Sequence, residues 1–209
     1  MAATKESSSR WALLIGINYY PQDRHPHGSV DDVNDIRAYL EQHSATAIHT
    51  SVLTATVPKD HLSTQDPPET PDARPTRANV LKQLRLIIDS TTPSDHVYIH
   101  FSGHGTQLLS DGNIGGTGFG EPSLVLYENG EHGASYFRGR FLAQALKRMV
   151  DKGLIVTVAL DRCFSGAVTR GDRVRAMEYE ALDADRAEQE RECKDAIGIP
   201  GRDARIDRD

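Results

Sequence analysis

Short apolar runs alternate along the chain with segments in which apolar residues recur at helical spacing. Four runs rich in β-branched and aromatic residues have the character of buried strands: Trp11–Ile17, the neighbourhood of Val52 and Leu53, Val97–Phe101 and Leu154–Leu160. Three segments predict helices: Asp31–Gln42, a helix capped by Thr76 that runs to Ile88, and Phe137–Met149 with Gly153 at its C-terminal cap. This alternation predicts an α/β fold, a three-layer sandwich around a mostly parallel central sheet.

Composition divides the chain into a central domain and two polar ends. Residues 1–9 are polar and are expected to form a disordered N-terminus, whereas residues 10–170 hold all the predicted strands and helices. Residues 171–209 carry many charges of both signs and a thin apolar stripe, so we expect a charged tail that is partly helical or disordered. Within the domain, Pro58–Pro75 predicts an exposed loop, and Ser123–Tyr127 predicts one arm of a small hairpin.

Charge and cysteine content favour a soluble protein of the cytoplasm. The 209 residues include 30 acidic and 24 basic ones, a formal net charge of −6, which argues against nucleic acid as a partner. No apolar run has the length of a membrane span, and the polar start lacks the apolar core of a secretory signal. Two cysteines make a poor disulfide framework, so we weigh Cys163 as a nucleophile and expect Cys193 to be an exposed bystander.

The third and fourth predicted strands each run into residues that carry chemistry. Ser102 and His104 follow the third strand, and Asp161 and Cys163 follow the fourth. Because side chains alternate along a strand, an imidazole and a thiol would face one cleft if the two strands were sheet neighbours. A thiolate there could attack a carbonyl while His104 manages the protons, and the backbone N–H groups of Gly105 and Cys163 could form an oxyanion hole. The alternative is that Cys163 is a small core residue, the more frequent role of a buried cysteine.

Three motifs together resemble those of the caspase-like cysteine peptidases, and in particular the metacaspases of fungal type. The motifs are Leu13–Tyr20 (LLIGINYY), Ser102–Gly105 (SGHG) and Asp161–Gly166 (DRCFSG). The resemblance covers the chain from Arg10 to Arg170, the large-subunit region of that fold. It implies endopeptidase activity with His104 and Cys163 as the catalytic dyad.

The same resemblance implies cleavage after Arg or Lys and maps the acidic substrate-binding pocket onto Asp32, Ser102 and Asp161. A carboxylate at Asp161, beside the candidate nucleophile, would also complement a cationic side chain on chemical grounds alone. For Asp32 an alternative remains open, because the macrodipole favours a negative charge in the first turn of a helix.

Two features of the chain depart from the family pattern. Arg162 and Phe164 stand where the motif around the cysteine usually has Ser and His. The small-subunit region of the family, with two further strands, has no visible counterpart after Gly171, so we expect only the large-subunit portion of the fold.

No cofactor and no metal are expected from the residues. Many metacaspases bind calcium, but residues 108–130 offer only three scattered carboxylates, too few for a site of six to eight oxygens. The histidines lack cysteine or carboxylate partners at ligand spacing, and no phosphate-binding loop precedes a helix.

The sequence therefore predicts a cysteine endopeptidase that takes protein or peptide substrates with Arg or Lys at the cleavage site. The alternative is a truncated or pseudo-peptidase module of the same fold that acts by binding, and both hypotheses allow association with another caspase-like chain. A flavodoxin-like nucleotide binder is the third and weakest hypothesis, because no phosphate loop supports it.

Overall fold

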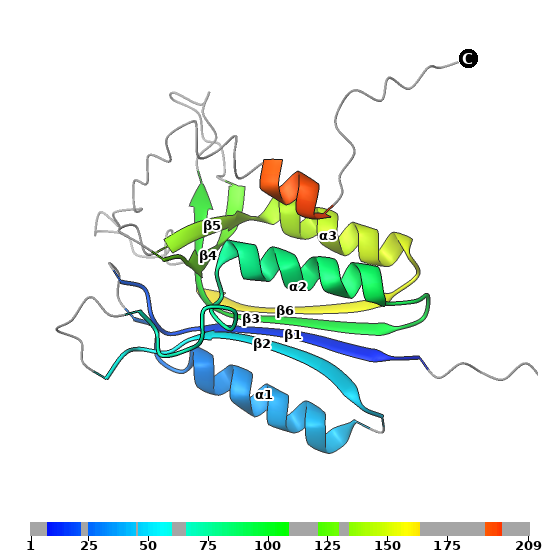
Figure 1. Ribbon diagram of the computed structural model, residues 1–209, viewed down its shortest axis with the longest axis horizontal. Coiled ribbons are helices and arrows are strands. Elements are labelled where there is room, and N and C mark those ends of the chain that lie inside the picture. Colours follow the sequence, from blue (N-terminus) through cyan, green and yellow to red (C-terminus); the bar gives the residue numbers. More distant parts are fainter. Residues whose placement is uncertain are drawn as a thin grey trace, which may run out of the picture.

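Four strands pair in parallel and form the centre of the computed structural model (Figure 1). In their order across the sheet they are β2 (Ile48–Ala55), β1 (Arg10–Ile17), β3 (His96–Leu108) and β6 (Ile155–Cys163). The structure describes residues 8–21, 25–44, 46–59, 66–108, 121–129, 134–163 and 191–197. All four strands expected from the apolar runs are present, and their parallel pairing confirms the predicted sheet.

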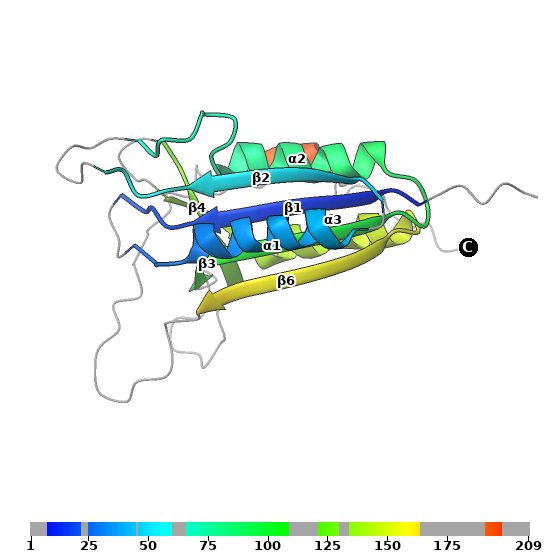
Figure 2. The ribbon, with the colours of Figure 1, turned by 90° about the horizontal axis from the view of Figure 1, so that it is seen from below.

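Helices cover the two faces of this sheet unequally. Helix α1 (Ser29–His43) lies on one face, and α2 (Arg77–Ser90) and α3 (Gly139–Asp151) lie on the other (Figures 1 and 2). The expected cap of α2 is confirmed, since the Thr76 hydroxyl accepts a hydrogen bond from the backbone N–H of Asn79 at 3.3 Å. This arrangement is the predicted three-layer α/β sandwich.

Helix α1 lies so close to β1 that only a glycine fits beneath it. A Cβ atom on Gly16 would lie 2.6 Å from the carbonyl oxygen of Ser29 and 2.9 Å from a methyl group of Val33. The helix begins directly after Gly28, whose φ of 97° is a left-handed conformation that favours glycine. Together the two glycines bring the first turn of α1 against the carboxyl end of the sheet.

Strand β3 is longer than its apolar run and changes neighbours along its length. Its first part lies between β1 and β6, and from Gly105 to Leu108 it pairs antiparallel with β4 (Glu121–Tyr127). β4 in turn pairs with β5 (Ala134–Arg138), which confirms the hairpin expected around Ser123–Tyr127. The SGHG motif, which we expected to follow the strand, therefore lies inside it.

The strands of the sheet are buried to very different degrees. Every residue of β1 from Ala12 to Ile17 is buried, whereas Ile155 and Leu160 of β6 are 51% and 39% exposed. Among the described residues, β6 pairs only with β3. The outer edge of β6 and much of its apolar surface are thus uncovered by the described part of the chain.

A helical segment at residues 191–197 packs against the core from within the charged tail (Figure 1). Cys193, which we expected to be exposed, is only 1% exposed, and Ile197 is fully buried. The expectation was wrong because these two residues are four positions apart and share one helical face. An ion pair of 2.8 Å between Glu192 and Arg77 of α2 joins the same segment to the domain.

No helix in the described ranges is both long enough and apolar enough to cross a membrane.

Candidate active site

The pairing of β3 with β6 brings the two predicted catalytic residues side by side. In the parallel register, His104 lies opposite Cys163 and Ser102 lies opposite Asp161. Neighbouring strands of a sheet are ~4.8 Å apart, so the two backbones hold His104 and Cys163 within reach of one another. The side chain of Cys163 lies outside what the structure describes. The condition set by the sequence, that the two strands be neighbours, is met.

His104 sits at the point where β3 changes partners. It is the last residue of β3 in register with β6, and the following residue, Gly105, lies opposite Leu124 of β4. The backbone of His104 therefore lies at the junction between a parallel and an antiparallel strand pairing. Gly105, which we expected to contribute to an oxyanion hole, directly follows it at the start of the antiparallel ladder.

Tyr20 contacts both the backbone and the ring of His104, and sequence reasoning missed it as a site residue. The backbone N–H of His104 donates to the Tyr20 hydroxyl at 3.0 Å, and this hydroxyl donates to the carbonyl of Val125 at 3.1 Å. The two rings are 4.8 Å apart between centroids, and Tyr20 is only 1% exposed. A Cβ on Gly103 would lie 2.8 Å from the same hydroxyl, so this approach requires a glycine. The one available signal was that Tyr20 closes the LLIGINYY motif.

The three residues of the predicted acidic pocket come from three elements. The Ser102 hydroxyl of β3 donates to a carboxylate oxygen of Asp32 on α1 at 3.1 Å, and Asp161 of β6 is in register with Ser102. Ser102 is buried, whereas Asp32 and Asp161 are exposed. Asp32 also lies in the first turn of α1, where the macrodipole favours a negative charge, and its substrate-binding role stays a prediction.

His100 lies two residues before Ser102 on β3 and was not expected at the site. It is 5% exposed, and its Nδ1 is 3.3 Å from the hydroxyl oxygen of Tyr98. Burial lowers the pKa of His100, while the negative charges of Asp161 and Asp32 act in the opposite direction. Because the effect of burial is the larger one, the neutral imidazole is favoured beneath two carboxylates.

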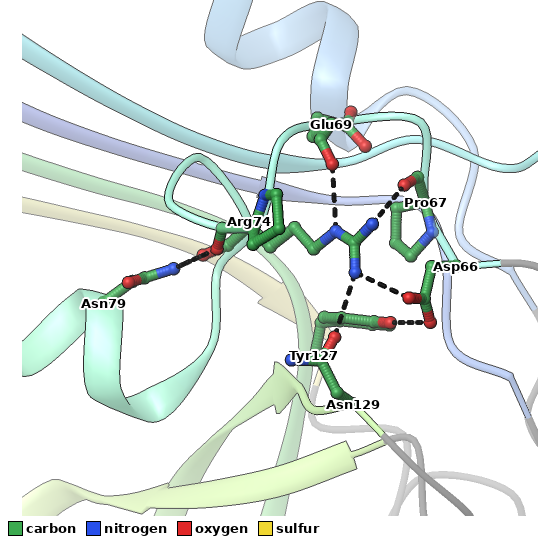
Figure 3. Close-up of polar contacts among 8 residues, drawn as sticks. Asp66, Pro67, Glu69, Arg74, Asn79, Tyr127 and Asn129 are labelled. Atoms are coloured by element: carbon green, nitrogen blue, oxygen red, sulfur yellow. Dashed lines mark hydrogen bonds and ion pairs between the residues drawn. The ribbon is translucent and has the colours of Figure 1, made fainter.

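The loop before α2 is anchored to the hairpin by Arg74, which Figure 3 shows among its partners. The guanidinium donates to the carboxylate of Asp66 at 2.8 Å and to the side-chain oxygen of Asn129 at 3.0 Å. It also donates to the backbone carbonyls of Pro67 and Glu69. The expectation of an exposed loop is confirmed for residues 66–75, since half of them are exposed and none lies in a helix or strand, and the mostly buried cation of Arg74 holds this loop together.

A tyrosine from the hairpin completes this anchor. The Tyr127 hydroxyl donates to Asp66 at 3.0 Å. Burial, and next this hydrogen bond, raise the pKa of Tyr127, while the hydrogen bond from Arg74 is the largest of the effects that lower the pKa of Asp66. The anchor thus pins the β2–α2 connection to the end of β4, on the same edge of the sheet as His104.

Two hollows flank the sheet at opposite ends. One of about 520 Å³ lies where β1 and β2 end and is lined by Asn18, His25, His27, Thr56 and Val57. The other, of about 290 Å³, lies at the amino ends of the strands beside Arg10, Ser44 and Ile155. Of these two hollows, the first lies at the carboxyl edge of the sheet, which also carries His104. Ligands of open α/β sheets bind at this edge.

The described residues contain no group of three or more His, Cys, Asp or Glu side chains arranged to hold a metal ion. Glu121, one of the three carboxylates between the two catalytic motifs, is instead paired with Arg138 at 3.0 Å and with Arg140 at 3.7 Å.

A parallel sheet between helices, with a histidine-bearing strand beside a cysteine-bearing strand, defines a caspase-like α/β domain. The family model described as metacaspase, peptidase C14 domain matches residues 10–170, and the chain belongs to this family.

Similar proteins have the same family name. Metacaspase-1A of Aspergillus niger is 27% identical over 161 residues, which cover 77% of this chain and 37% of that protein. Metacaspase-1A of Aspergillus fumigatus is 29% identical, with coverage of 77% and 36%, and metacaspase-1 of Coccidioides immitis is 28% identical, with coverage of 77% and 32%. The chain thus spans about a third of the length of these relatives.

A solved structure supports the fold. The crystal structure of a protein from Geobacter sulfurreducens superimposes with a TM-score of 0.53 at 21% identity, covering 77% of this chain and 52% of that one.

Proposed function

We propose that this chain is a cysteine endopeptidase domain in which Cys163 is the nucleophile and His104 the general acid and base. The observation that carries the proposal is the register of β3 and β6, which sets His104 opposite Cys163. Membership of the metacaspase family supports it. Two residues from distant parts of the sequence, each of the type that nucleophilic catalysis requires, are thereby neighbours on one sheet.

The reaction would follow from this pair. The Cys163 thiol gives its proton to His104, and the thiolate attacks the carbonyl carbon of the scissile peptide bond. The backbone N–H groups of Gly105 and Cys163 are the proposed donors to the oxyanion. His104 then protonates the leaving amine, and water hydrolyses the resulting thioester. Tyr20 would keep the backbone of His104 in place during these steps.

We further propose that the substrate side chain before the cleaved bond is Arg or Lys. Asp32, Ser102 and Asp161 lie on the face of the sheet that α1 covers, next to the His104–Cys163 pair. Two carboxylates in one place favour a cationic ligand and disfavour an acidic one. The proposed pocket therefore excludes Asp from this position.

Peptides with a fluorogenic leaving group after Arg, Lys or Asp test both parts of the proposal. We expect turnover with Arg and Lys peptides and none with the Asp peptide. Cys163→Ala and His104→Ala should each abolish turnover. The matched control is Cys193→Ala, which removes a thiol from the core and should retain turnover, with its folding checked by circular dichroism. Turnover that survives in Cys163→Ala would refute the assignment of the nucleophile.

A second candidate function, binding without catalysis, is favoured by the outer edge of β6, which no described part of the chain covers. Exposed strand edges invite pairing with another chain, and Ile155 and Leu160 add exposed apolar surface there. We propose that this edge receives elements from another caspase-like chain. Light scattering and turnover should be measured on one sample, with and without a longer family member. A monodisperse monomer with brisk turnover would contradict this candidate.

A further inference from the structure

The face of the sheet beneath the proposed pocket contains a histidine that no step of the reaction uses. His100 lies between Leu14 of β1 and Ala159 of β6 in the sheet register, and two residues further along β3 is Ser102. Residues two apart on a strand lie on the same face, ~6.6 Å from one another along the strand. His100 is therefore one layer deeper in the fold than Ser102, on the same side as the pocket residues.

One nitrogen of this imidazole lacks a partner. Nδ1 lies near the hydroxyl of Tyr98, but Nε2 is buried and has no hydrogen-bond partner among the described residues. A neutral histidine has one donor nitrogen and one acceptor nitrogen, and a buried polar atom without a partner is costly. If Nδ1 donates to Tyr98, Nε2 remains as an unfilled acceptor.

Among the described residues, the two charges that act on His100 are both negative. Asp32 of α1 and Asp161 of β6 act on it electrostatically, and on β3 itself the polar neighbours on this face are Tyr98 and Ser102. The flanking residues of β1 and of β6, Leu14 and Ala159, are uncharged. The phenol of Tyr98 has its pKa raised by burial, so it stays protonated and uncharged. In the tautomer whose Nδ1 donates to Tyr98, a cation bound between the two carboxylates would meet an acceptor at Nε2 rather than a second cation.

We propose that His100 is a specificity-determining residue at the base of the pocket and that its Nε2 accepts a hydrogen bond from the cationic head group of the bound substrate side chain. This inference rests on the proposed function. A guanidinium carries five N–H donors, so two carboxylates leave donors for a third acceptor, and Arg is favoured over Lys. A protonated His100 has no acceptor and adds a positive charge, so a proton and the substrate cation exclude one another at this site.

Steady-state kinetics between about pH 5 and about pH 8 test whether protonation of His100 and binding of the substrate cation exclude one another. For the Arg peptide, KM should rise by up to ~10-fold for each pH unit below the pKa of His100, with kcat less affected. A peptide with citrulline, which has the shape of Arg but no charge, should lack this rise and controls for titration of the catalytic pair. His100→Gln should flatten the KM profile and reduce the preference for Arg over Lys. His96→Gln, an exposed histidine at the start of the same strand, should change neither.

Binding without turnover separates this inference from the proposed reaction. Agmatine, a small guanidinium compound, is added at millimolar concentration while the His100 ring signals are followed by NMR across the same pH range. We expect agmatine to lower the pKa of His100 and Asp161→Asn to remove the effect. This result in a chain that cleaves no peptide would uphold the inference and refute the endopeptidase. Agmatine binding with an unchanged His100 would overturn the inference alone. Absence of binding would overturn the inference together with the basic pocket.

Discussion

Strands β1 and β6 are both rich in apolar residues but have very different surroundings. Both are continuous apolar runs rich in Leu, Ile and Val, the composition of a strand that is buried on both faces. β1 lies between β2 and β3, with helices on both sides, and is buried from Ala12 to Ile17. β6 has one described neighbour and exposes Ile155 and Leu160. The composition of β6 therefore indicates more cover than the described residues provide, and this strand bears the proposed nucleophile.

The difference also concerns how the two proposed catalytic residues are supported. His104 is held on the side of the hairpin by Tyr20, which is itself bonded to Val125 of β4. Cys163 is the last residue of the strand with the least cover. The described residues thus hold the backbone of His104 through Tyr20, whereas for Cys163 they provide only the pairing of β6 with β3.

The largest expected effect is on the free energy of unfolding, when an aliphatic side chain of the same size is truncated to alanine in each of the two strands. Leu14→Ala in β1 should lower the free energy of unfolding by about 2–5 kcal/mol, because a fully buried side chain leaves a cavity. Ile155→Ala in β6 should cost less than about 1 kcal/mol, since half of its surface is already in water. Urea denaturation of both variants measures the contrast. Equal losses would show that β6 is covered in solution, and adding the partner chain should raise the second value only.

Removing the hydroxyl group of Tyr20, which contacts the backbone of His104, should have the next largest effect. Tyr20→Phe leaves the His104 N–H and the Val125 carbonyl without their partner, at a cost of about 1–3 kcal/mol. We expect kcat to fall on the order of tenfold to a hundredfold, through displacement of His104, with KM changed much less. Tyr19→Phe is the matched control, since the ring of Tyr19 stacks on His25 instead. A variant with unchanged kcat would show that the catalytic position of His104 does not depend on Tyr20.

His100 lies between β1 and β6 and makes stability depend on pH. Burial lowers its pKa in the folded state below the unfolded value of ~6.5, so the unfolded chain binds a proton that the folded chain does not. Stability should therefore decrease as pH falls below ~6.5, by at most ~1.4 kcal/mol per pH unit, until the folded pKa is passed. Comparing denaturation of the wild type with His100→Gln isolates this contribution. Identical pH profiles would contradict it.

The reactivity of the two cysteines compares the end of β6 with the core. Iodoacetamide should modify Cys163 faster than Cys193, because Cys193 is buried and Cys163 lies opposite an imidazole that can take its proton. Site-resolved mass spectrometry gives both rates. The rate at Cys163 should fall in His104→Ala, while that at Cys193 stays the same. Equal rates at the two sites in the unmodified protein would remove the chemical support for the nucleophile.

The smallest effect is expected from calcium. Glu121 is engaged by Arg138 and Arg140, so it is not poised to bind a cation that needs six or more oxygens. Turnover in chelator and in millimolar calcium should agree. Strong activation would mean that the calcium ligands come from other residues. Hydrogen exchange of the backbone amides of β6, with and without calcium, would then show whether the cation acts at that edge.

Much of the fold could be predicted from the pattern of apolar residues. The four parallel strands, the three helices, the cap at Thr76 and the hairpin at Ser123–Tyr127 depend on neighbours in the sequence, and they were found close to where expected. The exception is Phe137, which was expected in the third helix and belongs to β5. The motifs also indicated that His104 and Cys163 belong together, since both come at the ends of apolar runs. Local spacing and composition suffice for such features because the responsible contacts lie within a few residues.

The tertiary structure alone decided which residues surround the site. The contact of Tyr20 with His104, the placement of His100 beneath Ser102 and the burial of Cys193 join segments that are far apart in the chain. The Arg74 anchor and the change of partner along β3 have the same origin. The sequence by itself determined the elements, and it also supplied the candidate catalytic residues, because a strand or helix pattern is a local property. Register, burial and hydrogen-bond partners were decided by packing, because each depends on which distant surfaces meet.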